Sequence, residues 1–229
     1  MRAPVLDVFF DLDHTLWDFE RNSALTFEKI LPKNQIPINP SEFVTQYVPI
    51  NYKYWELFRE DKISKEELRF GRLKETFNFF NLELEQEKLE VLSEEYIRYL
   101  PENNYLFEGA IELLDYLKPK YNLHIITNGF HDVQYQKLSN SKLLPYFKTI
   151  TNSESVGVKK PNPIIFEFAL RQANAKRENS IMIGDCIDAD VLGALNCGMD
   201  AILFSTNPRI NQNKNIKQIN HLLNLKNYL

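Results

Sequence analysis

Three short polar stretches of this chain could carry chemistry, and each follows a run of apolar residues. They read DLDHT at 11–15, TNG at 127–129 and GDCIDAD at 184–190. The first puts two carboxylates, Asp11 and Asp13, one residue apart directly after a segment rich in Val and Phe. An ionised carboxylate is costly to bury unless another group pairs with it. These acids therefore point to a site that supplies a partner for them.

The elements that must position these residues follow from the pattern after Tyr105, where strands and helices alternate. Together with a strand over 5–10, the pattern predicts a strand that ends in a turn over 122–129 and strands in 148–155, 180–185 and 200–205. It predicts helices in 108–118, 131–143, 162–173 and 189–198. Asn162 and Pro163 favour the start of one helix, and Gly198 the end of another. Such alternation predicts a doubly wound parallel α/β sheet with helices on both faces.

Ligands of open parallel sheets bind beyond the carboxyl ends of the strands, which is where all three polar stretches fall. A single acid after a strand is commonly a helix cap or a turn former, and TNG alone is a turn signal. Their joint occurrence at successive strand ends, with KKPNP at 159–163 between the second and third, predicts one shared site.

The segment between the first strand and the alternating region reads as helical. A capping box of Ser64 and Glu67 opens one helix, residues 85–99 form an acidic amphipathic helix, and Ser41 is expected to cap another. We therefore predict an all-helical cap domain at 18–103 inserted into a discontinuous α/β core domain of 1–17 and 104–229. The insertion begins directly after the two acids and is expected to cover them.

Composition excludes several classes of protein. A net charge of −4 argues against a general nucleic-acid binder. The chain has two cysteines and no CxxC motif, which argues against a disulfide framework. No stretch approaches the ~18 apolar residues of a membrane span, and Asp7 and Asp11 interrupt the apolar N-terminal run that a signal peptide would need. We expect a cytoplasmic protein that binds neither membranes nor nucleic-acid polymers. The Asn-rich segment 211–229 is expected to end in a short amphipathic helix.

At these residues the chain resembles the haloacid dehalogenase superfamily, in its phosphatase branch with a helical cap after the first motif. The matching motifs are Asp11-x-Asp13-x-Thr15, Thr127-Asn128-Gly129, Lys160-Pro161, and Gly184-Asp185 with Asp190. The stretches DLDHTLWDF and SESVGVKKPNPIIFEFAL are most similar to 5′-nucleotidases that act on pyrimidine nucleoside monophosphates.

The resemblance implies a Mg²⁺-dependent phosphomonoester hydrolase that forms an aspartyl-phosphate. It makes Asp11 the nucleophile and a metal ligand, Asp13 the general acid/base and a ligand through its backbone carbonyl, and Asp185 a carboxylate ligand. Asp190 braces the site. A carboxylate that attacks a dianionic phosphate meets charge repulsion of about 4 kcal/mol per unit pair at ~4 Å, and Mg²⁺ offsets it.

The resemblance further implies that Lys160 directs positive charge toward the phosphoryl oxygens and Asp11. It implies phosphate binding by Thr127-Asn128-Gly129, through the hydroxyl of Thr127 and the backbone N–H of Asn128. Lys159 is an alternative cation, although it also reads as a solvated surface residue.

One position departs from the family pattern, because His14 stands where many relatives carry glycine. It reads as a loop residue, with a role in cap contact or substrate fit as the alternative. His124 reads as a satisfied core histidine. Sugar-phosphate or phosphoglycolate phosphatases, a phosphomutase and a non-catalytic phosphate-binding module are the competing functions. A 2-haloacid dehalogenase is disfavoured because that branch lacks the second acid, here Asp13. The partner implied is a small phosphate ester.

Overall fold

A computed structural model describes residues 4–207 and 215–229, and in it the chain divides into two compact units. One comprises 1–18 and 104–229, and the other comprises Phe19–Asn103. Residues 1–3 and 208–214 of the predicted core domain lie outside the described residues. Within the described ranges, no helix combines the length and the apolar character that a bilayer span requires.

The first unit is built on a sheet of parallel strands, as the alternating pattern predicts. In chain order the strands are β1 (Asp7–Phe10), β2 (Asn122–Thr127), β3 (Thr149–Asn152), β4 (Ser180–Gly184), β5 (Asp200–Phe204) and β6 (Lys217–Ile219). Their spatial order is β3-β2-β1-β4-β5-β6. The predicted doubly wound α/β fold is confirmed.

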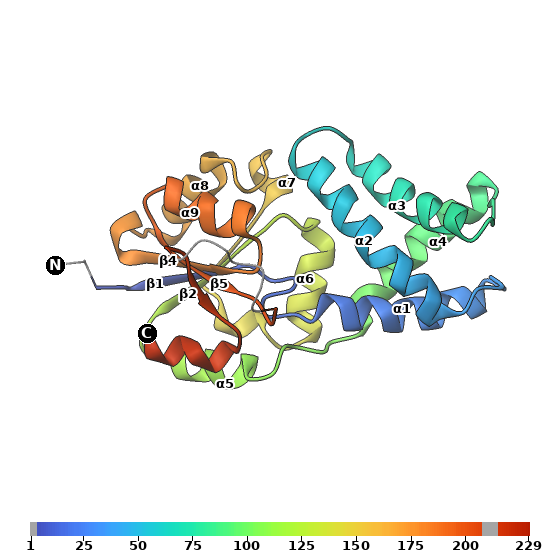
Figure 1. Cartoon of the computed structure of the whole chain (residues 1–229). Coiled ribbons are helices and arrows are strands. Elements are labelled where there is room, and N and C mark those ends of the chain that lie inside the picture. Colours follow the sequence, from blue (N-terminus) through green and yellow to red (C-terminus); the bar gives the residue numbers. More distant parts are fainter. Residues whose placement is uncertain (1–3, 208–214) are drawn as a thin grey trace. The chain divides into compact units, whose positions relative to one another are not determined.

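Helices cover both faces of this sheet, as right-handed crossovers between parallel strands require. The helices of this unit are α5 (Ala110–Leu117), α6 (His131–Asn140), α7 (Ser153–Val156), α8 (Pro163–Ala173) and α9 (Gly193–Asn196), with a π-helical segment, η4 (Ile187–Leu192), before α9. Figure 1 shows α8 and α9 on one face of the sheet and α5 on the other. Asn162 caps α8, whose first residue is Pro163, as predicted.

The C-terminal segment ends in a short helix as predicted, but this helix is of the 3-10 type and a strand that was not predicted precedes it. The segment forms the edge strand β6, which pairs with β5, and then a 3-10 helix over Leu222–Asn227. Three residues with the sequence Lys-Gln-Ile carry no periodic signal, so only the pairing with β5 defines them as a strand.

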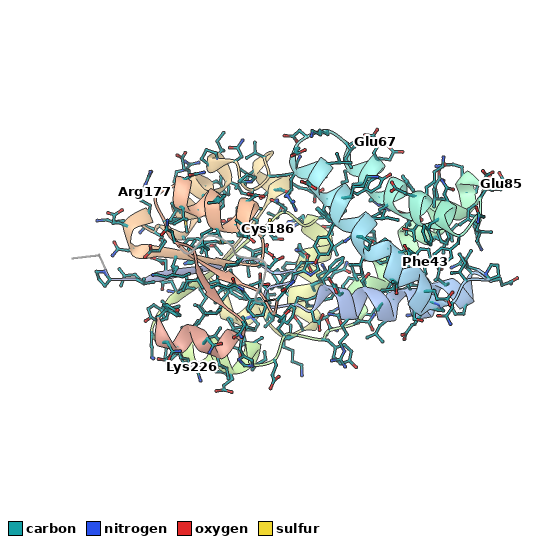
Figure 2. The ribbon with its side chains drawn as sticks, in the orientation of Figure 1. Phe43, Glu67, Glu85, Arg177, Cys186 and Lys226 are labelled. Atoms are coloured by element: carbon teal, nitrogen blue, oxygen red, sulfur yellow. The ribbon has the colours of Figure 1, made fainter. Side chains whose placement is uncertain are left out.

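The second unit is all helical, in keeping with the predicted cap. Its helices are α1 (Phe19–Lys33), α2 (Pro40–Arg59), α3 (Lys65–Phe79) and α4 (Gln86–Tyr99), followed by a 3-10 turn at Leu100–Glu102. The capping box of Ser64 and Glu67 opens α3 as predicted, and Figure 2 labels Glu67 there. The predicted cap at Ser41 is wrong. Asn39 caps α2 instead, because Pro40 suits the first helical position and the Asn39 side chain accepts from the Ser41 N–H.

An aromatic cluster fills the interior of the helical unit. The ring of Phe27 lies 4.8 Å from Phe43, 4.6 Å from Tyr47 and 4.8 Å from Tyr96. These residues come from α1, α2 and α4, so one set of ring contacts joins three helices. These four aromatic residues therefore serve packing.

His124 is a satisfied core histidine, as predicted. Its Nδ1 lies 2.8 Å from Thr149 Oγ1, its Nε2 lies 3.3 Å from Asp7 Oδ1, and its ring stacks on Phe9. Burial lowers the pKa of His124, against the opposing effect of Asp7. A neutral ring that donates from Nε2 to Asp7 and accepts at Nδ1 from Thr149 fits these contacts.

We predict that His124 makes the stability of the protein fall with acid. The folded pKa lies below the unfolded value of ~6.5, so the unfolded state binds more protons between these two values. The contribution of His124 to the free energy of unfolding is fully present above pH ~6.5 and is lost as the pH falls toward the folded pKa. The loss amounts to about 1.4 kcal/mol for each unit by which the folded pKa lies below the unfolded one. Urea unfolding from pH ~5 to ~7.5 should show a smaller loss in His124→Gln than in the wild type. Equal losses would contradict this assignment.

Candidate active site

The three polar stretches of the sequence meet at one edge of the sheet. β1 pairs in parallel with β2 on one side and with β4 on the other. Asp11, Asn128 and Asp185 each stand directly after one of these adjacent strands. Parallel strands end at the same edge, so the register brings together side chains that lie more than a hundred residues apart.

Lys160 lies at the centre of this group. It is 2% exposed, and its Nζ donates to Asp11 Oδ1 at 2.6 Å, Asp190 Oδ1 at 2.6 Å and the carbonyl of Ile126 at 2.8 Å. These three acceptors match the three N–H bonds of an ammonium group. Burial alone would lower the pKa of Lys160, but Asp11 and Asp190 raise it above its usual value. Lys160 is therefore a charged, fully hydrogen-bonded group.

Asn128 fixes the segment that carries Lys160. Its side-chain Nδ2 donates to the Lys160 carbonyl at 3.0 Å, and its Oδ1 accepts from the Lys160 backbone N–H at 2.7 Å. The following Lys160–Pro161 peptide bond is cis. The side chain of Asn128 is thus committed to the lysine segment.

Thr127 offers a hydroxyl with a defined orientation. Its Oγ1 accepts from the Gly129 N–H at 3.1 Å and from Gln134 Nε2 at 2.7 Å. Two donors therefore occupy the oxygen, and the hydroxyl hydrogen is left to donate. A phosphate oxygen is a suitable acceptor for it.

The carboxylate of Asp190 packs closely against the backbone at Gly184 and Cys186. Its Oδ2 accepts from the Cys186 N–H at 3.0 Å while its Oδ1 accepts from Lys160. Cys186, labelled in Figure 2, precedes the π-helical η4 that carries Asp190. A Cβ added at Gly184 would lie 2.3 Å from the Asp190 carboxyl carbon. Only glycine at position 184 leaves room for this acid, whose two oxygens are already engaged.

The carboxylates of Asp11, Asp185 and Asp190 form the acidic cluster of the site. One ligand atom from each lies within 4.8 Å of the others, and the described residues contain no other group of this kind. Burial raises the pKa of Asp11 to about 7, with Lys160 opposing it. Burial, then Asp190 and Asp11, raise the pKa of Asp185. Three acids facing one lysine leave an excess of negative charge. Because Lys160 and the Cys186 N–H engage both oxygens of Asp190, the carboxylates of Asp11 and Asp185 are the donors that a hard divalent cation such as Mg²⁺ fits.

Asp13 has partners that the sequence analysis missed. Lys137 Nζ lies 2.6 Å from Asp13 Oδ1, and Gln134 Nε2 lies 2.9 Å from Asp13 Oδ2. Both partners come from α6, the helix that follows the TNG stretch. In the sequence, these two residues could have been recognised only by their spacing of three, which places them on one face of a helix. Most residues of α6 are polar, so the spacing does not distinguish this pair from its polar neighbours.

His14 adopts a left-handed backbone conformation with φ of 62°. A glycine adopts positive φ without the steric cost that a side chain brings, which explains the glycine of many relatives. Histidine is among the residues that tolerate this region better than most. The departure from the family pattern is therefore compatible with the same turn.

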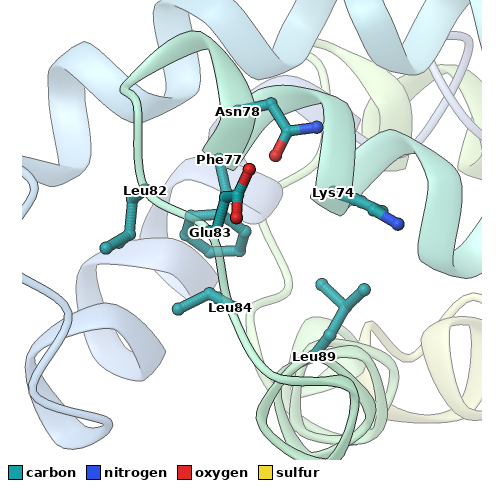
Figure 3. Close-up of a pocket in the computed structure, with 7 residues that line it drawn as sticks. All are labelled: Lys74, Phe77, Asn78, Leu82, Glu83, Leu84 and Leu89. Carbon is teal, nitrogen blue, oxygen red and sulfur yellow. The ribbon is translucent and has the colours of Figure 1, made fainter.

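The helical unit has a cavity of its own. It measures about 230 Å³ and lies in the part of the unit shown in Figure 3. Its lining residues are Lys74, Phe77, Asn78, Leu82, Glu83, Leu84 and Leu89. A single acid faces it, so it lacks the carboxylate cluster that the strand ends provide.

Comparisons with known proteins agree with this fold. A family model described as haloacid dehalogenase-like hydrolase matches residues 8–204. The pyrimidine 5′-nucleotidase PynA of Streptococcus pneumoniae is 33% identical over 86% of this chain and 83% of its own. The pyrimidine 5′-nucleotidase YjjG of Escherichia coli is 32% identical over 84% of this chain and 82% of its own. The magnesium-bound structure of the HAD-hydrolase YfnB from Bacillus subtilis has a TM-score of 0.90 at 28% identity and covers 99% of both chains.

We predict that Asp185→Asn weakens Mg²⁺ binding at least about tenfold, because an amide carries no charge to attract the cation. Isothermal titration of the purified protein with Mg²⁺ measures this directly, without substrate. Asp188→Asn is the matched control, since Asp188 is an exposed acid three residues further along the chain. Unchanged affinity in Asp185→Asn, or an equal loss in both variants, would contradict the proposed ligand.

Proposed function

We propose that this chain, which belongs to the haloacid dehalogenase-like hydrolase family, is a Mg²⁺-dependent 5′-nucleotidase acting on pyrimidine nucleoside monophosphates. The chain is a phosphoric monoester hydrolase of that family. The mechanism, the metal and the nucleotide substrate are the parts that we propose.

The observation that carries the mechanism is the hydrogen bond between the Lys160 ammonium and Asp11 at 2.6 Å. It fixes one carboxylate oxygen and leaves the other available as a nucleophile. The same lysine places positive charge where a phosphoryl group would approach, which reduces the repulsion between two anions. When bound, Mg²⁺ would supply further charge neutralisation through Asp11, the Asp13 carbonyl and Asp185.

In the first step an oxygen of Asp11 forms a bond to phosphorus as the bond to the ester oxygen breaks. The ester oxygen leaves with the electron pair and takes a proton from Asp13. In the second step a water attacks phosphorus and gives a proton to Asp13, and the bond between Asp11 and phosphorus breaks. Splitting hydrolysis in this way replaces one slow step with two easier ones.

Thr127 and the backbone of Asn128 would hold the phosphoryl group during both steps. The Thr127 hydroxyl hydrogen and the Asn128 N–H are donors that supply hydrogen bonds to phosphoryl oxygens. Gly129 supports them through its N–H to Thr127 Oγ1 and by leaving space beside its Cα. Asp190 would brace Lys160 through the hydrogen bond between its Oδ1 and the lysine Nζ.

We choose a pyrimidine nucleotide because two similar proteins with that activity, 33% and 32% identical, align with more than four-fifths of this chain. A glyceraldehyde 3-phosphate phosphatase that is 32% identical over 87% of the chain makes a triose phosphate the second candidate substrate. Relatives that share only the catalytic motifs would support the chemistry but not the substrate.

We predict that Asp11→Asn reduces turnover by more than about 10³-fold while the fold persists, because the amide has the shape of the carboxylate but is a poor nucleophile. Acid-quenched wild-type protein incubated with a ³²P-labelled phosphate ester should carry label on Asp11. Asp188→Asn should retain full turnover and labelling. Label on a serine or histidine, or none at all, would count against the nucleophile.

We further predict that the best pyrimidine monophosphate exceeds every non-nucleotide substrate by about tenfold or more in kcat/KM, a usual range for discrimination by a shaped site. The panel is dUMP, dTMP, UMP, AMP, glucose 6-phosphate, glyceraldehyde 3-phosphate and phosphoglycolate, each at the same Mg²⁺ concentration. A non-nucleotide that exceeds all pyrimidines tenfold would replace the nucleotidase with a general or sugar-phosphate phosphatase. Such a result would leave the aspartyl-phosphate mechanism in place.

A further inference from the structure

Helix α6 presents two buried polar side chains to the loop that follows β1. Gln134 is 1% exposed and Lys137 is 2% exposed, and they stand three residues apart on one face of the helix. Their neighbours at 135 and 136 are exposed. A lysine is rarely buried to this degree unless it is paired, so Lys137 has a specific task at this position.

Both side chains converge on Asp13. Lys137 Nζ contacts Oδ1 at 2.6 Å, and Gln134 Nε2 contacts Oδ2 at 2.9 Å. Each carboxylate oxygen therefore has its own donor, and the two donors together fix the rotation of the carboxylate plane. Because an ionised carboxylate only accepts hydrogen bonds, these contacts also fix the orientation of the Gln134 amide.

The aromatic ring of Trp17 supports the lysine. Lys137 Nζ lies 4.3 Å from the centroid of this ring, which is fully buried. Trp17 belongs to the same turn as Asp13, since its carbonyl accepts from the His14 N–H. A cation over an indole face is attracted by the ring electrons. The turn that carries the acid thus also carries a platform for the cation that binds it.

Gln134 links Asp13 to the phosphate-binding stretch. The Nε2 that donates to Asp13 also donates to Thr127 Oγ1 at 2.7 Å. A Cβ added at Gly129 would lie 2.3 Å from this Nε2 atom. Glycine at position 129 is therefore required for the Gln134 side chain to pass, which gives the third residue of the TNG stretch a physical role.

We propose, on the basis of the phosphomonoesterase function above, that Lys137 and Gln134 are positioning residues that hold the Asp13 carboxylate in the orientation for proton transfer. Neither residue exchanges a proton with substrate. Lys137 acts on the reaction through Asp13, so removing it matters only where Asp13 acts. Gln134 also donates to Thr127 Oγ1, so the test is made at Lys137.

The test measures how much Lys137→Met changes kcat/KM, first in the protein with Asp13 intact and then in the Asp13→Asn variant. With a nucleoside monophosphate, Lys137→Met should lower kcat/KM about 10- to 100-fold, because a small misplacement of a catalytic group has effects of this size. With 4-nitrophenyl phosphate, whose leaving group needs no proton, kcat/KM should fall less than about threefold. Rapid acid quenching should then show more phosphoenzyme at steady state, since hydrolysis of the intermediate still needs Asp13. In Asp13→Asn, adding Lys137→Met should change kcat/KM less than about twofold.

Lys142→Met is the matched control, because it removes one positive charge from an exposed residue just after α6. It should leave both substrates and the phosphoenzyme level unchanged. Equal losses for both substrates, or the same loss in both Asp13 backgrounds, would overturn the positioning role. Thermal unfolding identifies a variant that fails to fold, and Lys137→Gln, which removes the charge but keeps a polar side chain, then serves for the same comparisons. A wild type that hydrolyses no phosphate ester would instead refute the proposed function.

Discussion

Lys160 carries a positive charge into the interior of the α/β unit, where an unpaired charge is not tolerated. Its ammonium group is held by Asp11, Asp190 and one strand carbonyl. Removing one partner from such a buried group typically costs about 3–5 kcal/mol, because the other charge is left uncompensated. The surrounding backbone is arranged around this constraint. Gly184 leaves space for Asp190, and Asn128 holds the segment from which the lysine extends.

A second buried lysine repeats the arrangement at the other acid of the first motif. Lys137 pairs with Asp13 as Lys160 pairs with Asp11, and both pairs have a distance of 2.6 Å. The environments differ, because Asp11 is almost fully buried and Asp13 is partly exposed. A buried acid beside a lysine suits a nucleophile, whereas an acid with access to solvent suits proton exchange with a leaving group or a water. Two carboxylates one residue apart thus lie in the different environments that the two proposed roles require.

The helical unit is stabilised by a different principle. The ring of Phe27 packs against aromatic rings of neighbouring helices. The buried Arg72 lies over the ring of Tyr96 and donates a hydrogen bond to Asn51. Helical periodicity and the capping box of α3 are local signals, and they were sufficient to predict an all-helical segment. The N-terminus of α2 was not predicted correctly, since Asn39 and Ser41 are both good capping residues and only the observed backbone path distinguishes them.

The sequence by itself determined the doubly wound α/β fold and the stretches whose residues meet at the strand ends. Both follow from local information, namely hydrophobic periodicity, turn residues, and motifs whose order and spacing mark a family. The tertiary structure alone decided that Lys137 and Gln134 reach Asp13, that the Asn128 side chain binds the lysine segment, and that β6 exists. Asp13 and Lys137 are 124 residues apart. A lysine on a helix reads as solvated until the neighbouring strands are placed beside each other, because its burial is a property of the packed sheet and not of its own segment.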